Sequence, residues 1–179
     1  MFQKFRIFFI RWTIAQFEIY FFERKVSALY KKIFQKRALT IIDVGANRGQ
    51  TIDFFLKLND KSKLYSFEPN PNLFEELQIK YSTCKNIKLI QKGVSKKIET
   101  KTFFENILDE SSSFEELNMD SDYLKMKSSI LGVKPQNIVK ESYPVEVTTL
   151  NDFIIRNKIL EVDVLKIDTE GHEFECLEG

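Results

Sequence analysis

The chain has 179 residues, of which 43% are hydrophobic and 30% are charged, so we expect one folded domain and exclude intrinsic disorder. Its 27 basic and 26 acidic side chains nearly cancel, so no global field favours a nucleic-acid ligand. The only two cysteines, Cys84 and Cys176, are far apart in the sequence; this excludes a disulfide framework and a structural zinc site and favours a cytoplasmic protein.

Residues 1–37 carry nine Lys or Arg residues, two Asp or Glu residues and many aromatic side chains. We expect a helical leader that lies outside the sheet. Its most apolar part, Trp12 to Phe22, contains Glu18 and is eleven residues long, whereas a membrane span needs about 20 apolar residues. A basic aromatic helix of this kind packs on its own domain, packs on a partner subunit or lies on a membrane surface. Peripheral membrane contact and a homodimer therefore stay open.

Strand and helix patterns alternate from residue 38 onward. Short segments rich in apolar and branched residues predict strands at 38–44, 63–67, 87–91 and 162–167. Alternation of apolar and polar residues predicts a half-buried strand at 144–148, and an additional strand is expected at 100–104. Helical spacing predicts helices at 51–58, 72–81, 152–157 and from 173 onward. The polar segment 105–142 is expected to be a variable insertion with one or two short helices. The alternation predicts a doubly wound, mostly parallel α/β sheet within a domain of residues 38–179.

Three polar clusters follow predicted strands, at residues 43–49, 68–69 and 168–172. Open α/β sheets bind ligands at such strand ends. In the first cluster, DVGANRG, two of the three glycines of a dinucleotide fingerprint are replaced by Asn47 and Gln50. A pyrophosphate cradle is therefore disfavoured, and an NAD-dependent oxidoreductase is kept only as an alternative. The amide of Asn47 suits a neutral or zwitterionic ligand instead, and Gly45 allows a sharp turn after the strand.

Glu68 closes the second strand, 25 residues after Asp43. At this position a carboxylate can accept hydrogen bonds from the two ribose hydroxyls of a nucleoside, and Pro69 stiffens the turn. The alternative is a solvated loop glutamate.

The third cluster supplies the candidate catalytic residues, Asp168 and His172. Asp168 follows a buried strand, so we expect it to face the ligand cleft. His172 is the only histidine in the chain and is a candidate general base, because its unperturbed pKa is about 6.5; a surface histidine at the start of a helix is the alternative. A metal held by Asp168, Glu170 and His172 is a weak pattern, and no metal is expected.

IIDVGANRGQTIDFF, SFEPNP and VDVLKIDTEGHEFECLEG, in this order and spacing, resemble the FkbM family of S-adenosylmethionine-dependent methyltransferases. The resemblance covers residues 40–100 and 143–179. It implies a Rossmann-like fold and O-methylation of a hydroxyl on a sugar or another small molecule. It also implies cofactor contacts from Asp43, Gly45, Ala46, Asn47 and Gly49 to the methionine part, from Glu68 and Pro69 to the ribose, and from Gly93, Val94 and Ser95 to the adenine. Asp168 would contact the methionine amino group or the acceptor.

The chain departs from the family pattern in two ways. The family sheet has about seven strands, whereas five or six are counted here, so we expect the sheet to be incomplete at the C-terminus. A catalytically incomplete cofactor-binding fragment is therefore an alternative to an active enzyme. Residues 1–37 and 105–142 match no part of the family pattern, and substrate choice is expected to lie there.

Overall fold

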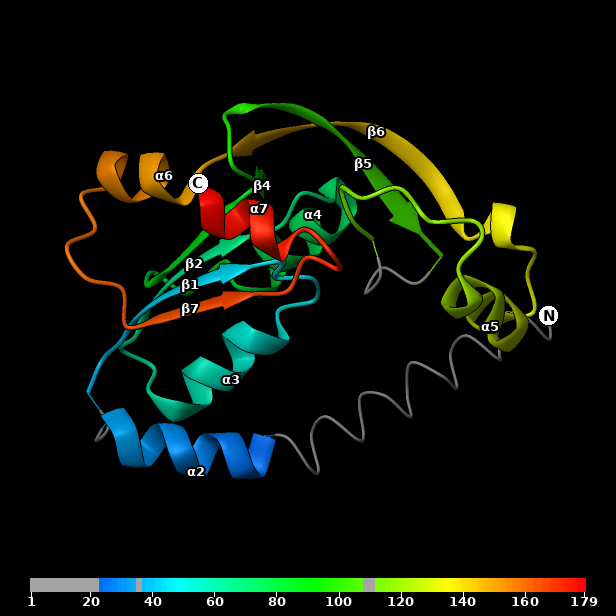
Figure 1. The fold of residues 1–179 in the computed structure, drawn as a ribbon. Coiled ribbons are helices and arrows are strands. Elements are labelled where there is room, and N and C mark those ends of the chain that lie inside the picture. Colours follow the sequence, from blue (N-terminus) through cyan, green and yellow to red (C-terminus); the bar gives the residue numbers. More distant parts are fainter. Residues whose placement is uncertain (1–22, 35–36, 108–111) are drawn as a thin grey trace.

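The computed structural model describes residues 23–34, 37–107 and 112–179 (Figure 1). Most of the predicted leader lies outside these residues. Its described helix, α2 (Glu23–Phe34), agrees with the helical prediction. Tyr30 and Phe34 of α2 pack against the buried side chains beneath the sheet, with the Tyr30 and Phe55 rings 5.3 Å apart between centroids. This part of the leader is therefore a second layer over the core. None of the described helices combines the length and apolar character needed to cross a bilayer.

The centre of the fold is a four-stranded sheet in which all neighbours are parallel, which confirms the predicted sheet. Its strands are β1 (Thr40–Val44), β2 (Lys63–Phe67), β3 (Ile87–Ile90) and β7 (Val164–Ile167), in the order β3-β2-β1-β7. The helices that accompany it are α3 (Gln50–Leu58), α4 (Pro71–Lys80), α6 (Leu150–Arg156) and α7 (Glu173–Glu178). This is the Rossmann-like class of fold.

The two faces of the sheet are covered by different helices (Figure 1). On one face, Ile41 of β1 packs with Ile52 and Phe55 of α3. On the other face, Ile42 and Val44 pack in a cluster that includes α6 and α7 side chains. Because β1 is buried on both sides, it reads as a continuous apolar run rather than an alternating one.

A second sheet stands beside the first and changes the predicted layout of the chain. It has the order β4-β6-β5, from β4 (Gly93–Val94), β5 (Glu99–Asn106) and β6 (Val139–Thr148). β6 is antiparallel to β5 and parallel to β4. Both long strands run beyond their predicted limits, so the strand limits 100–104 and 144–148 were too narrow. The extra residues are polar, and pairing of β5 with β6 holds them in the strand despite their weak apolar pattern.

Between β5 and β6 the described chain forms α5 (Asp122–Leu131) and a short 3₁₀ helix, η3 (Pro135–Asn137), as predicted for this segment. Capping side chains set several helix starts. The Asn70 side chain accepts hydrogen bonds from the backbone of Asn72 and Leu73 at the start of α4. Thr149 accepts one from the backbone of Asp152 at the start of α6, as expected of an N-cap threonine.

Candidate functional site

The predicted polar clusters meet at one edge of the parallel sheet. Val44, the last residue of β1, lies in register with Phe67 of β2 and Ile167 of β7. The next residues along the three strands are therefore neighbours. The Gly45 N–H donates to the Phe67 carbonyl at 3.1 Å, and the Asp168 N–H donates to the Val44 carbonyl at 3.0 Å. The fold thus brings together segments that are far apart in the sequence.

Gly45 is the point at which the first and third clusters touch. Its φ is +83°, and a Cβ at this position would lie 2.1 Å from the backbone carbonyl oxygen of Asp168. Only glycine allows both this dihedral angle and this approach. Gly49 also has a positive φ, of +82°, but a Cβ there would meet side-chain atoms of Tyr81 and Leu77. The loop between β1 and α3 is therefore shaped by two glycines with different constraints.

Asp43 is completely buried at the end of β1. Within the described part of the chain neither carboxylate oxygen has a hydrogen bond of good geometry; the Lys166 ammonium lies 3.4 Å from Oδ1, and Thr51 is a second nearby donor. Burial raises the pKa of Asp43 to about 6, against the opposing effect of Lys166. A buried carboxylate without hydrogen bonds is costly to a folded protein, so this group is a candidate ligand contact.

Lys166 is a site residue that the sequence analysis missed. From β7 its Nζ donates to the Gly45 carbonyl at 3.1 Å and lies 3.4 Å from one oxygen of each of Asp43 and Asp168. In the sequence, the only indication of this role was a lysine near the end of the predicted buried strand VDVLKI. It joins a fully buried carboxylate to Asp168, whose side chain is 62% exposed, and so links the inside of the site to its surface.

Glu68 holds the loops of the site together. One carboxylate oxygen accepts the Asn47 N–H at 2.7 Å, and the other accepts the Asn70 N–H at 2.9 Å. The side chain is buried, which makes the alternative of a solvated loop glutamate wrong. Burial raises the pKa of Glu68 to about 7, although the two backbone donors oppose this shift. Asn47 has a φ of +48°, and its side-chain oxygen is buried without a hydrogen-bond partner.

Four other residues were predicted to contact the cofactor, and they lie in different surroundings. Ala46 and Val94 are buried in the apolar core, so only their backbone can face a ligand. Pro69 is half-buried beside Glu68. Ser95, after β4, is fully buried and lies beside α7 rather than beside the first cluster.

His172 is fully buried, so the alternative of a surface histidine is wrong. Its Nδ1 lies 2.7 Å from Glu115 Oε1, and its Nε2 lies 3.0 Å from Ser95 Oγ. The Phe114 ring packs against the imidazole with centroids 5.3 Å apart. Both ring nitrogens are therefore engaged inside the protein. Glu115 is a further residue that sequence reasoning missed, because nothing local marks a contact across 57 residues.

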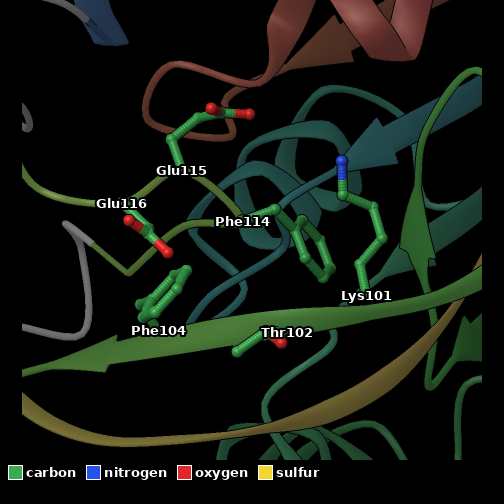
Figure 2. A pocket seen from close by; sticks show the side chains of 6 residues that line it. All are labelled: Lys101, Thr102, Phe104, Phe114, Glu115 and Glu116. Carbon is green, nitrogen blue, oxygen red and sulfur yellow. The ribbon is translucent and has the colours of Figure 1, made fainter.

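A hollow of about 610 Å³ lies next to this group (Figure 2). Figure 2 shows Glu115 pointing toward the turn that precedes α7, with Phe114 and Phe104 over β5. The segment is tied to the strand ends, because the Ser113 hydroxyl donates to the Thr169 carbonyl at 3.0 Å. Ser113 is buried and forms an isolated antiparallel β-bridge with Phe104. The lining residues are Lys101, Thr102, Phe104, Phe114, Glu115 and Glu116.

Comparison with known proteins places this arrangement among methyltransferase domains. The model of the methyltransferase FkbM domain matches residues 43–179, which include all three strand-end clusters. No curated protein matches the chain.

Two solved structures are similar to parts of the chain. Methyltransferase FkbM from Methylobacillus flagellatus KT is 15% identical with a TM-score of 0.48, and the similarity covers 85% of this chain and 32% of that one. A putative rRNA-methylase from Clostridium thermocellum is 20% identical with a TM-score of 0.33, covering 40% of this chain and 42% of that one. The chain thus spans about a third of the length of the first structure.

Proposed function

The chain belongs to the FkbM methyltransferase family, and from this we propose that it binds S-adenosylmethionine at the strand ends and methylates a hydroxyl of a sugar or another small hydroxylated molecule. One observation carries the proposal. Asp43, which lies within the family match, presents a fully buried carboxylate that has no hydrogen bond of good geometry among the described residues, at the edge where such folds bind ligands.

The residues present fit the cofactor. The methionine part carries an ammonium group, for which the carboxylate of Asp43 and the side-chain oxygen of Asn47 are acceptors that have no well-formed hydrogen bond to any described residue. Gly45 and Gly49 keep side chains away from this loop. Each oxygen of Glu68 accepts one backbone N–H and keeps a second lone pair for a ribose hydroxyl. The adenine would lie toward Gly93 and Val94.

The hollow beside β5 is the proposed acceptor site. Its aromatic rings, Phe104 and Phe114, offer apolar faces, and Glu115 and Glu116 offer carboxylates that accept hydrogen bonds from hydroxyls. This combination suits a saccharide better than an apolar or anionic acceptor. The tie between Ser113 and Thr169 holds the hollow next to the strand ends.

When bound, S-adenosylmethionine supplies an activated methyl group with a good leaving group, so the protein mainly positions the reactants. Asp168 is the proposed base for the acceptor hydroxyl because its side chain reaches solvent. Lys166, 3.4 Å from Asp168 Oδ2, orients that carboxylate. His172, whose two nitrogens are engaged within the protein, is better placed to hold neighbouring groups than to accept the proton.

Calorimetric titration of the purified chain with S-adenosylmethionine and with NAD tests the cofactor. We expect binding of S-adenosylmethionine and none of NAD; the opposite result overturns the proposal. Transfer of radiolabelled methyl groups to a pool of saccharides then tests the reaction. An Asp168→Asn variant that keeps cofactor affinity but loses transfer would support the role of this carboxylate, whereas full transfer by it would remove that role.

A further inference from the structure

We propose that Glu115, His172 and Glu175 form a binding site for one divalent transition-metal ion, of the Zn²⁺ or Mn²⁺ kind, at the edge of the hollow beside β5. One ligand atom from each residue lies within 4.8 Å of the other two. From the sequence, Asp168 and Glu170 were the carboxylates considered as partners of His172. The fold instead places Glu115 and Glu175 beside the imidazole.

The distances within the group suit such an ion. His172 Nδ1 lies 2.7 Å from Glu115 Oε1 and 3.8 Å from Glu175 Oε2. Ligand atoms bound about 2.1 Å from a metal are separated by roughly 3.0 Å in octahedral geometry and roughly 3.4 Å in tetrahedral geometry. The observed distance to Glu115 is shorter than these values and the distance to Glu175 is longer. Rotation of the two glutamate side chains would therefore bring both carboxylates to bonding distance of one ion.

The imidazole is held as a metal ligand usually is. Its position is fixed by burial, and its second nitrogen, Nε2, has its own partner in Ser95 Oγ at 3.0 Å. A histidine ligand commonly has such a partner on its other nitrogen, which fixes the ring orientation. The remaining nitrogen, Nδ1, faces both carboxylates. Imidazole is a common ligand of Zn²⁺, and carboxylates bind both Zn²⁺ and Mn²⁺, so this donor set suits either ion.

The site is also accessible. The Glu115 side chain is 49% exposed and the Glu175 side chain is 27% exposed, and Glu115 lines the hollow. With three protein ligands, an ion would keep open positions toward that hollow. If the hollow receives a hydroxylated acceptor, the ion would bind the acceptor's oxygen atoms and orient them. This role rests on the proposed function, whereas the metal site itself does not.

Binding predicts a change of tautomer at His172. Without metal, Nδ1 faces the Glu115 carboxylate, which can only accept, so we infer that Nδ1 carries a proton; Nε2 lies within hydrogen-bond distance of the Ser95 hydroxyl. A metal on Nδ1 requires the ring proton to be on Nε2 instead. The Ser95 hydroxyl oxygen then accepts from Nε2.

The single histidine in the chain makes this change directly measurable. Untagged full-length protein with ¹⁵N-labelled histidine is stripped of metal and titrated with Zn²⁺, while calorimetry gives the stoichiometry. We expect one equivalent to bind, to shift the Nδ1 resonance and to move the ring proton to Nε2. Glu115→Gln and Glu175→Gln should each weaken Zn²⁺ binding at least about tenfold.

Glu116→Gln is the matched control, because Glu116 is a neighbouring glutamate that also lines the hollow but lies outside the three-residue group. It should leave the affinity unchanged within about twofold. The proposal is overturned if Zn²⁺ leaves both His172 nitrogens unshifted, or if all three variants bind it as the unmodified chain does. Because the readout uses neither S-adenosylmethionine nor methyl transfer, it is independent of failure of the proposed function.

Discussion

Replacing Asp43 by Asn should stabilise the protein at neutral and alkaline pH. The carboxylate is completely buried, and its charged partner, the Lys166 ammonium, lies 3.4 Å away and does not offset the effect of burial. Burial raises its pKa from 3.8 to about 6, so the folded state binds this proton more tightly than the unfolded chain does. The free energy of unfolding must therefore fall as pH rises from about 4 to 6. A shift of about 2 units corresponds to about 3 kcal/mol, which the uncharged Asn variant should recover at pH 8.

Urea denaturation of both proteins between pH 4 and pH 8 measures this effect. The two curves should meet near pH 4 and separate by up to about 3 kcal/mol above pH 6. Burial, and to a smaller extent the charge of Asp43, raises the pKa of Glu68 to about 7, so Glu68 lowers stability with rising pH in both proteins. Asp168→Asn, at a largely exposed carboxylate, is the control and should change stability by less than about 0.5 kcal/mol. An Asp43→Asn variant less stable than the parent at pH 8 would refute the reasoning.

Three further predictions concern the loops and helix starts. Glu68→Ala should weaken S-adenosylmethionine binding at least about a hundredfold, because charge-assisted hydrogen bonds of about 1.5–3 kcal/mol each are lost; an unchanged dissociation constant in calorimetry would contradict this. Gly45→Ala should lower the melting temperature more than Gly49→Ala, because its Cβ would meet a backbone oxygen at 2.1 Å rather than side chains that can move; equal melting temperatures would be inconsistent with this close approach of Gly45 to Asp168. Thr149→Ala should cost about 1 kcal/mol in urea denaturation through loss of the cap of α6, and no measurable loss would show that the cap contributes nothing.

The parts of the fold that follow from local patterns were predictable. The strand Lys63–Phe67 was predicted with its observed limits, because it is a short apolar run between polar turns. The strand-end clusters were predicted to meet because parallel strands end on the same side of a sheet, and the register around Val44 confirms this.

What could not be predicted depends on contacts between distant segments. The second sheet forms because β5 and β6 pair along the whole of β5, although the outer parts of both strands are too polar to read as strands. The contact between Glu115 and His172 has no local signature. Lys166 was visible in the sequence, but its role depends on the register of β7 beside β1, which places it next to Asp43.

The pairing of β1 with β7 also has a consequence for how the protein is made. β7 is synthesised long after β1, yet it lies directly beside it, and Gly45 is in contact with Asp168. Until residue 168 has left the ribosome, the loop after β1 lacks one of its walls. A nascent chain can pair β1 with β2, and β2 with β3, early, because these contacts are close in sequence, but closing the distance to β7 is slow. The proposed cofactor site is therefore expected to form late during translation, after the strands on its other side have already paired.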